Sequence, residues 1–183
     1  MIDDIIYKPR SGNEMMQAIK APSSLWLYSN LCEKFAHDPL MMLHHIFNGK
    51  RNALILLQDP RNMNSGHWIS LSIHPEKKSI YFFSSYGGKP DREKNEWLSD
   101  FSLLRSNQKD DIINDALKRL HKMGWKVHYN DFPYQREGDN TATCGIWTAA
   151  FLNSGLNPDD FFHYTTSRGY NVVDYYNMYF LTE

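Results

Sequence analysis

Three short apolar segments in the first half of the chain constrain the fold more than any other feature of the sequence. Residues 52–58 form an almost continuous apolar run, which is typical of a strand buried on both faces. In residues 67–74 aliphatic side chains alternate with Trp, Ser and His, as in a strand with two different faces. Residues 79–83 are β-branched and aromatic, and residues 75–78 are few enough to connect the last two segments as a hairpin. The pattern therefore predicts a small, mostly antiparallel sheet.

The segments on either side of this sheet are typical of helices. The clearest is residues 110–123, where apolar residues recur at helical spacing and Gly124 ends the pattern. Further helices are expected at residues 13–20, 23–35, 39–47 and 144–152, with one or two more in the aromatic-rich residues 159–181. Residues 125–129 are expected to add a short strand. Helices flanking a small sheet define an α+β class.

The composition is that of one ordinary folded domain. Of the 183 residues, 42% are hydrophobic and 22% are charged, so residues 1–183 are expected to form a single domain with its own core. A net charge of −1 gives no indication of a nucleic-acid partner. No apolar run approaches the roughly 20 residues that span a membrane, so no membrane partner is expected. Two cysteines cannot define a disulfide framework, and we expect free thiols in an intracellular, reducing environment.

Cys144 has the local context of a reactive thiol. It follows the polar residues 136–141 and begins the apolar segment 144–152. A thiol at a helix N-terminus is exposed to the positive end of the helix dipole, which lowers its pKa. Gly145 leaves room for a substrate backbone, and the local N–H groups suit an oxyanion hole. The alternative is that Cys144 is only a small buried residue at a helix start, as we expect for Cys32.

A thiolate nucleophile also needs a proton acceptor, which is normally histidine. Among the eight histidines, His67 is distinguished by its neighbours Gly66 and Trp68 at the start of a predicted strand. That position holds the ring rigidly and leaves one edge accessible. Taken alone the signal is weak, because most of the eight are expected to be surface or structural residues. Neither cysteine has a second ligand at a zinc spacing, so we expect no metal and no cofactor.

The order of these motifs resembles adenain-type and Ulp-type cysteine proteases. The motifs that carry the resemblance are, in order, Gly66-His67-Trp68, the turn-closed strand Tyr81 to Gly87, Gln135 and Cys144-Gly145. The resemblance covers about residues 66–152 and looks most like the maturation proteases of adenoviruses, virophages and related DNA viruses. It implies a papain-like, adenain-like α+β fold whose nucleophile lies at a helix N-terminus.

The resemblance also implies a role for each matched residue. His67 would act as general base and later as the acid for the leaving amine. Cys144 would attack the scissile carbonyl and form an acyl-enzyme. Gln135 would contribute its side-chain amide to the oxyanion hole, beside the backbone N–H of Cys144. Three residues would line the substrate-binding site: Trp68, Gly66 and Gly145.

The chain departs from the family pattern at Ser84, where the family usually has Asp or Glu to orient the imidazole. A hydroxyl can accept a hydrogen bond from Nδ1–H, but it cannot stabilise an imidazolium by charge. Three interpretations remain: Ser84 performs the role together with a water molecule, Asp91 reaches in from the following loop, or the activity has been lost. We favour the first, since Cys–His pairs also work with a neutral third member. It predicts that Ser84→Asp raises the turnover of a model peptide.

The function implied by the resemblance is that of a thiol endopeptidase that processes viral capsid or core precursor proteins during virion maturation. An activating peptide would be a further partner. Such an enzyme would act in the host cytoplasm or the viral factory and be packaged in the virion. Two alternatives stay open: a Ulp-like isopeptidase that removes SUMO or ubiquitin, and a catalytically weakened binding protein that keeps the protease fold. An acyltransferase on the same scaffold is more remote.

Overall fold

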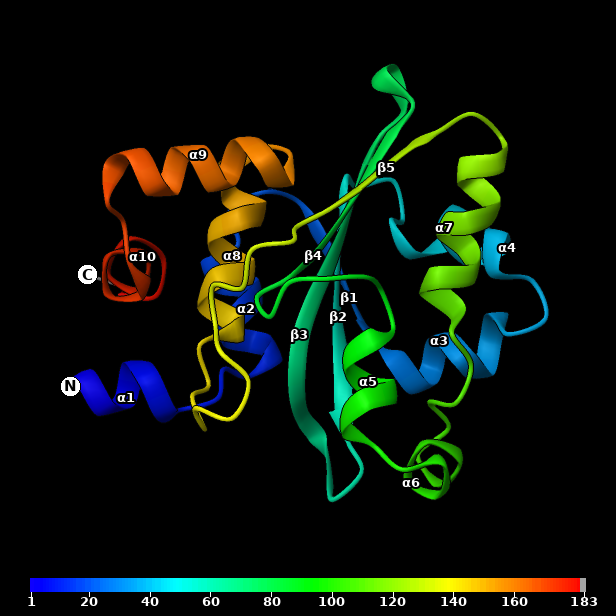
Figure 1. The fold of residues 1–183 in the computed structure, drawn as a ribbon, viewed down its shortest axis with the longest axis horizontal. Helices are drawn as coiled ribbons and strands as arrows, with labels where there is room; N and C mark the ends of the chain where they lie inside the picture. The colour runs from blue at the N-terminus through cyan, green and yellow to red at the C-terminus, as the bar shows by residue number, and fades with distance from the viewer. Residues whose placement is uncertain (182–183) are drawn as a thin grey trace.

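A mixed five-stranded sheet lies at the centre of the computed structural model, which describes residues 1–181 (Figure 1). The strands neighbour one another in chain order: β1 (Ser23–Leu27), β2 (Asn52–Asp59), β3 (Asn62–His74), β4 (Ser79–Ser84) and β5 (Lys126–Tyr129). The central pairs β2–β3 and β3–β4 are antiparallel, whereas the edge pairs β1–β2 and β4–β5 are parallel. The predicted α+β class is confirmed, with the antiparallel pairing confined to the middle of the sheet. Thr182 and Glu183, the last residues of the predicted domain 1–183, lie outside the described residues.

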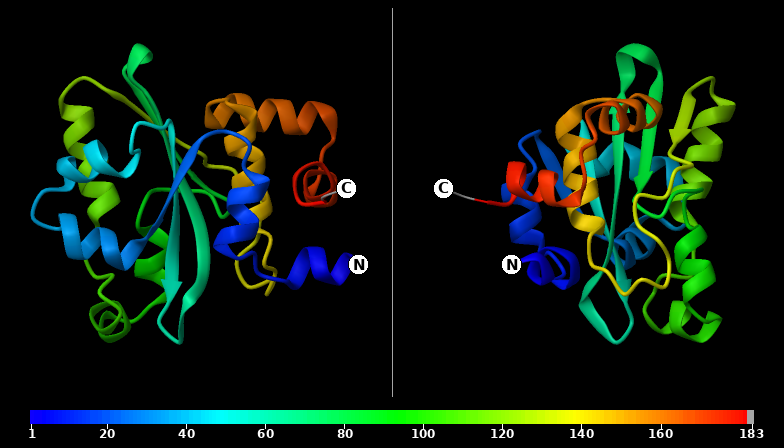
Figure 2. Two further views of the ribbon diagram at one scale, coloured as in Figure 1. Left: turned by 180° about the vertical axis from the view of Figure 1, so that it is seen from behind. Right: turned by 60° about the vertical axis from the view of Figure 1, so that its left-hand side comes forward.

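Helices cover both faces of the sheet (Figure 2). One layer contains α3 (Tyr28–Phe35), α4 (Pro39–Ile46) and α7 (Ile112–Lys122). The other contains α2 (Gly12–Ala18), α8 (Cys144–Ser154), α9 (Pro158–Arg168) and α10 (Val172–Tyr179). Outside these layers, α1 (Ile2–Tyr7) packs on α10, while α5 (Arg92–Trp97) and α6 (Asp100–Arg105) lie in the connection between β4 and α7. A short 3-10 turn, η1 (Pro75–Lys77), joins β3 to β4.

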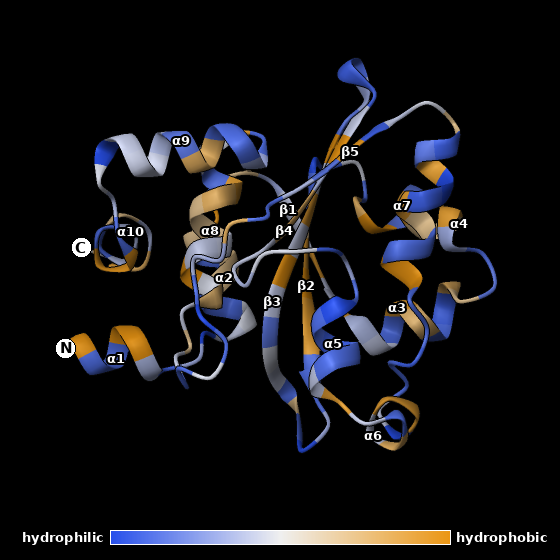
Figure 3. Ribbon diagram, in the orientation of Figure 1, coloured by the Kyte–Doolittle hydropathy of each residue, from blue (hydrophilic) through white to orange (hydrophobic). Residues whose placement is uncertain are grey.

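The two helical layers explain why β2 is apolar without a break. Successive side chains of a strand point to opposite faces. Ile55 and Leu57 therefore enter the core under α3, α4 and α7, while Leu54 and Leu56 enter the core under α8. Both faces are covered, so both need apolar side chains. Figure 3 shows hydrophobic residues along β2, in contrast to the hydrophilic connection between β2 and β3.

The three strand-like segments are confirmed as β2, β3 and β4, but β3 begins earlier than expected. It starts at Asn62, and Gly66 pairs with Gln58 across the β2–β3 ladder. Gly66 has a φ of +155°, and a Cβ at this position would lie 1.9 Å from the carbonyl oxygen of Leu57. Only glycine permits this close approach of the two strands. His67 therefore lies within β3, paired with Leu57 and next to the register shift at Gln58–Asp59, rather than at the start of the strand.

The helix predicted for residues 23–35 is wrong in its first half. Ser23–Leu27 forms β1, which pairs in parallel with β2 from Ser23↔Asn52 to Leu27↔Leu56, and the helix begins only at Tyr28. No local signal separates the two states in this mixed polar and apolar segment. The non-local pairing of this segment with the edge of β2 favours a strand over a helix.

The other predicted helices are confirmed to within a few residues at their ends. The most buried of them is α8, whose first nine residues are all buried between the sheet and its neighbouring helices. This burial on every side explains why its sequence shows no polar face. Among residues 1–181, no helix is both long and apolar enough to cross a membrane.

Candidate active site

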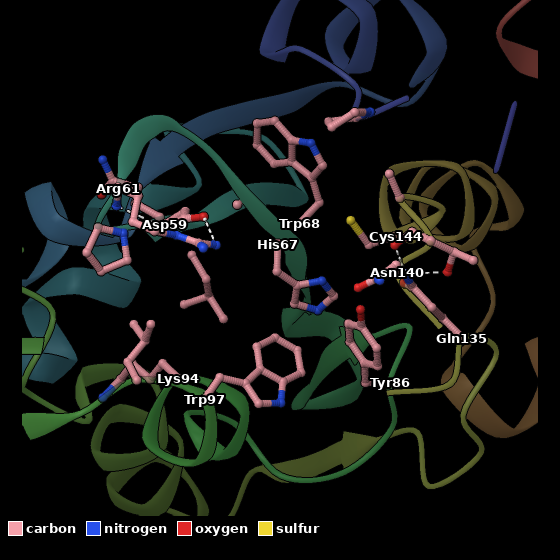
Figure 4. A pocket seen from close by; sticks show the side chains of 18 of the residues that line it. Asp59, Arg61, His67, Trp68, Tyr86, Lys94, Trp97, Gln135, Asn140 and Cys144 are labelled. Atoms are coloured by element: carbon pink, nitrogen blue, oxygen red, sulfur yellow. Dashed lines mark hydrogen bonds and ion pairs between the residues drawn. The ribbon is translucent and has the colours of Figure 1, made fainter. Parts of the chain in front are cut away.

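Three structural elements bring three of the four predicted catalytic residues to one cavity of about 650 Å³ (Figure 4). Cys144 begins α8, His67 lies in β3, and Gln135 lies in the loop after β5. Five of the seven predicted site residues line the cavity: Gly66, His67, Trp68, Gln135 and Cys144. Ser84 lies outside the lining, at the end of β4 and fully buried behind His67. The structure therefore brings together residues that are up to 78 positions apart, counting from Gly66 to Cys144.

Gly145 does not line the cavity, contrary to its predicted role in substrate binding. A Cβ on Gly145 would lie 2.8 Å from the sulfur of Met15 and 3.2 Å from the Cβ of Arg10. The missing side chain thus allows the N-terminal segment to pack closely on α8. The structure thus gives a packing reason for this glycine, and its role in substrate binding stays a prediction.

The imidazole of His67 is held between aromatic rings. Its centroid lies 4.8 Å from that of Tyr86 and 5.6 Å from that of Trp97. Both aromatic residues also line the cavity, and Trp97 was not singled out from the sequence. Burial lowers the pKa of the His67 imidazole to about 3. The ring is therefore neutral at ordinary pH and can accept a proton.

The thiol of Cys144 is buried at the first position of α8. Burial raises its pKa, while backbone hydrogen bonds from Trp68, Gly145 and Cys144 itself act in the opposite direction. The lowered pKa expected from the helix N-terminus is not found in this free chain, because the loss of water outweighs the nearby amides. The resting pair thus consists of a neutral thiol and a neutral imidazole.

Ser84 connects His67 to a carboxylate that the sequence analysis missed. The Nε2 atom of His67 lies 3.0 Å from Ser84 Oγ, and Ser84 Oγ donates a hydrogen bond to Oε1 of Glu93 in α5. Two predictions about Ser84 are therefore corrected: its ring partner is Nε2 rather than Nδ1, and its second partner is Glu93. Nothing in the local sequence distinguishes Glu93 from Glu96, so only the folded structure reveals it.

Asp91 does not reach the histidine, so that interpretation is wrong. Its carboxylate accepts hydrogen bonds from the Tyr28 hydroxyl at 2.6 Å and from the Asn114 backbone at 2.8 Å. Burial raises the pKa of Asp91 to about 6. These contacts direct its side chain toward α3 and α7 and away from the cavity.

Gln135 is fully engaged in hydrogen bonds within the protein. Its Oε1 accepts from the Ser85 hydroxyl at 2.9 Å, and its Nε2 donates to the carbonyl and hydroxyl oxygens of Thr141 at 2.7 and 3.1 Å. An oxyanion hole needs a donor that is aimed at the substrate oxygen. The oxyanion role of Gln135 therefore stays a prediction, and it requires that Thr141 release the amide.

The N-terminal segment is a part of the site that the sequence analysis missed. The indole N–H of Trp68 donates to the carbonyl oxygen of Arg10 at 2.9 Å, and Arg10 itself lines the cavity. The guanidinium of Arg10 lies 4.9 Å from the ring centroid of Tyr176 in α10. Trp68 lines the cavity, and Arg10, whose guanidinium packs on α10, accepts its indole hydrogen bond.

No metal site accompanies these residues in the part of the chain that the structure describes. Among residues 1–181 there is no group of three or more His, Cys, Asp or Glu side chains that could hold a metal ion. Both cysteines are buried and free.

The sequence of this chain matches the model of a known protein family. A family model described as the Ulp1 protease family, C-terminal catalytic domain, matches residues 57–158. This range contains His67, Ser84, Gln135 and Cys144, and it covers more than half of the chain. The protein is a cysteine protease. It belongs to the Ulp1 protease family.

Two viral proteins are similar to this chain in sequence. Protein V9 of Sputnik virophage, described as uncharacterized, is 28% identical over 148 residues, which cover 75% of this chain and 71% of V9. The protease of bovine adenovirus 2 is 26% identical over 112 residues, 61% of this chain and 49% of that protease. The chain thus spans about half the length of the adenovirus relative.

Solved structures of SUMO proteases also align with this fold. One is the SUMO protease Ulp1 with its catalytic cysteine oxidised to a sulfinic acid, at 16% identity and a TM-score of 0.37, covering 90% of this chain and 73% of that one. Another is a de-sumoylating protease at 17% identity and a TM-score of 0.38, covering 90% of this chain and 69% of that one. The family assignment rests on the sequence match and not on these alignments.

Proposed function

We propose that this cysteine protease is a thiol endopeptidase that processes viral capsid or core precursor proteins during virion maturation. The similarity to an adenovirus protease and to a virophage protein supports this direction. The chain spans only about half of the adenovirus protease. The proposal therefore also rests on the residues of the candidate active site.

The observation that carries the proposal is the meeting of Cys144 and His67 at one cavity. The two residues come from different elements, α8 and β3, and both lie inside the segment matched by the family model. Figure 4 shows both side chains at this cavity, with Tyr86 and Gln135 beside them. A thiol and an imidazole in such an arrangement can perform acyl transfer.

The reaction proceeds through a thioester. Nδ1 of His67 takes the thiol proton as Cys144 Sγ bonds to the scissile carbonyl carbon. The carbonyl oxygen becomes an oxyanion that accepts hydrogen bonds from the Cys144 backbone N–H and the Gln135 amide. The C–N bond then breaks, and His67 returns the proton to the leaving amine. Water, deprotonated by His67, hydrolyses the thioester and restores the thiol.

The cavity walls indicate which peptides fit. Trp68, Tyr86 and Trp97 are large aromatic residues in the lining. We propose that the residues next to the cut are small, such as glycine. A protein substrate would bind there as an extended segment.

The Ulp-like isopeptidase remains a second candidate because the matching family model is that of the Ulp1 proteases. An isopeptidase would use the same thioester chemistry on a different acyl donor, the C-terminus of a ubiquitin-like modifier. The distinction therefore lies in which protein delivers its carbonyl to Cys144.

One experiment separates the candidates. Purified chain and its Cys144→Ala variant are incubated with viral capsid precursors and, separately, with SUMO and ubiquitin carrying a C-terminal vinyl sulfone. Cleavage of precursors that Cys144→Ala abolishes supports the maturation protease. Labelling of Cys144 by a modifier probe without precursor cleavage supports the isopeptidase. If neither occurs, even with virion peptides added as activators, the proposed substrates are wrong.

The proposal includes a location. A maturation protease has to enter the particle together with its substrates, so the chain is expected in purified virions as well as in infected-cell cytoplasm or viral factories. Quantitative mass spectrometry of purified virions tests this. Absence from virions would argue against maturation and for a role in the host cell.

A further inference from the structure

Glu93 is a carboxylate in the protein interior directly behind the candidate catalytic histidine. The residue is 0% exposed. Its Oε1 accepts the hydrogen bond from Ser84, and its Oε2 is buried without a hydrogen-bond partner among the described residues. Burying a carboxylate is costly unless it is well paired. A carboxylate buried at this cost in desolvation free energy requires an explanation beyond packing.

Helix α5 holds Glu93 at this position through the residues on both sides. Lys94 is 2% exposed and donates to Asp111 at 2.8 Å. Arg92 donates to the carbonyl oxygen of Gly87 at 3.0 Å and to the carboxylate of Glu137 at 3.2 Å. These contacts attach the helix to α7, to the turn after β4 and to the loop before α8. Glu93 therefore has little freedom to leave Ser84.

Ser84 is held as firmly as its partner. Its backbone N–H donates to the side-chain oxygen of Asn130 at 3.2 Å, and its carbonyl oxygen accepts from the side-chain nitrogen of Asn130. Its hydroxyl also accepts from the backbone N–H of Tyr86 at 3.4 Å. The hydroxyl thus has a defined place between His67 and Glu93.

The directions of these hydrogen bonds follow from the chemistry of the groups. An ionised carboxylate can only accept, so the single hydroxyl proton of Ser84 points at Glu93. The hydroxyl oxygen can then only accept from His67, which places the ring proton on Nε2. The other ring nitrogen, Nδ1, is left with a lone pair to take the proton of the thiol.

We propose that Glu93 is a positioning residue that acts through Ser84 to keep His67 in the tautomer that is able to deprotonate Cys144. Glu93 supplies at one remove the carboxylate that the family usually places directly beside the histidine. Without it the Ser84 hydroxyl can rotate and donate to Nε2, which moves the ring proton to Nδ1 and removes the base. This inference rests on the proposed peptidase function for its kinetic consequences, but not for the state of the ring.

The first experiment measures peptide hydrolysis by Glu93→Gln and by the matched control Glu96→Gln. Glu96 is on the same helix, but its side chain is 48% exposed and forms an ion pair with Arg92. Glu93→Gln is expected to lower kcat by about 10- to 100-fold at unchanged KM, the effect of losing a hydrogen bond to a charged group. Glu96→Gln is expected to match the wild type. Equal kcat for Glu93→Gln and wild type would overturn the proposal.

A double variant tests whether the two residues act as one unit. Ser84→Ala removes the link, so adding Glu93→Gln to it is expected to cause no further loss of kcat. If the fold-losses in kcat of the two single variants multiply in the double variant, Glu93 acts by a route other than Ser84. Ser84→Ala also keeps the test available if Glu93→Gln fails to fold, since it breaks the same connection while Glu93 stays in place.

The second experiment observes the ring itself and needs no substrate. In protein with ¹⁵N-labelled histidine, the His67 signal is assigned by its loss in His67→Ala. Two-bond nitrogen–proton spectra of the wild type are expected to show the proton on Nε2. Glu93→Gln or Ser84→Ala is expected to move it partly or fully to Nδ1. An unchanged tautomer in both variants would overturn the proposal even if the wild type cleaves peptides, and the expected shift would uphold it even if no viral precursor is cut.

Discussion

The imidazole of His67 and the carboxylate of Glu93 are both buried, on either side of the Ser84 hydroxyl, and burial moves their pKa values in opposite directions. It lowers the pKa of His67 to about 3, and it raises the pKa of Glu93 above its usual value while the hydrogen bond from Ser84 opposes the shift. Falling pH therefore protonates Glu93 before it protonates His67. The base loses its orienting partner while it is still neutral.

This order of protonation predicts an acid limb in kcat that belongs to Glu93. Activity needs the ionised carboxylate, so kcat is expected to fall as the pH drops through the raised pKa of Glu93. In Glu93→Gln the plateau is lower and this limb is lost, which leaves the limb of His67 at lower pH. A kcat profile from acidic to neutral pH checks this. The same acid limb in both proteins would contradict it.

The stability of the same variant is the control for a purely structural role. The folded-state pKa of Glu93 is raised, so ionising it costs stability as the pH rises through the window between the ordinary and the raised value. At neutral pH, Glu93→Gln is therefore expected to keep or increase the Tm while kcat falls. A residue that only anchors α5 would lower both.

The structure changes the expectation for Ser84→Asp. With Glu93 already behind Ser84, a second buried carboxylate would face the first, and one of the two would stay protonated. The single variant is therefore expected to turn over a model peptide more slowly than the wild type. Ser84→Asp/Glu93→Gln relieves the repulsion and is expected to be faster than Ser84→Asp alone. Higher turnover of the single variant would restore the prediction from sequence.

At the scale of elements, the loop of residues 136–143 holds the side-chain amide of Gln135 in its resting position. Thr141 in this loop binds the amide of Gln135 with two oxygen atoms, and Ala142 donates to the carbonyl oxygen of Ile6 at 2.7 Å. Glu137 joins the loop to α5 through Arg92. The loop is thus attached to three parts of the site, and its resting position occupies the amide that an oxyanion would need.

Weakening this hold is expected to help catalysis. Thr141→Val removes one of the two acceptors and should raise kcat/KM by about 2- to 10-fold, the effect of one neutral hydrogen bond. Peptide kinetics measure it, and Gln135→Ala serves as the reference background. In that background Thr141→Val is expected to have no effect. A fall in kcat/KM in the Gln135-containing protein would mean that the resting loop position is the active one.

At the scale of the whole molecule, the two ends of the chain meet beside the site. Arg10 is 6% exposed, donates to the carbonyl oxygen of Asp4 and lies against Tyr176 of α10. Its own carbonyl oxygen holds Trp68. Figures 1 and 2 show α1 and α10 side by side, next to α8. Contacts between the ends therefore support the cavity wall.

Loss of the Arg10 side chain is expected to weaken both stability and activity. Arg10→Ala should lower the free energy of unfolding by about 1–3 kcal/mol, through lost packing, a lost hydrogen bond and a lost cation–π contact. The matched control is Lys8→Ala, since Lys8 contacts the same Glu14 but its side chain is 60% exposed. Denaturant unfolding and peptide kinetics measure the two effects. If Arg10→Ala and Lys8→Ala have the same free energy of unfolding and the same activity, the Arg10 side chain does not support the site.

Local patterns predicted much of this protein because they depend on neighbours in the chain. The continuous apolar run of β2, the alternation in β3 and the helical spacing of α7 each reflect burial that repeats with the period of the element. The order of His67, Gln135 and Cys144 was enough to indicate a cysteine protease, and the family match confirms that class. The individual roles of these residues stay predictions.

Only the tertiary structure determined the features that depend on residues close in space but distant in sequence. Ser23–Leu27 became a strand because the edge of β2 was available to pair with it. Gly145 is explained by Met15 and Arg10, which lie more than 100 positions away. No sequence pattern distinguishes Glu93, because its proposed role depends on its burial and on the hydrogen bond from the Ser84 hydroxyl. The burial of a single polar side chain and the identity of its hydrogen-bond partners are properties of the packed molecule, and no local pattern encodes them.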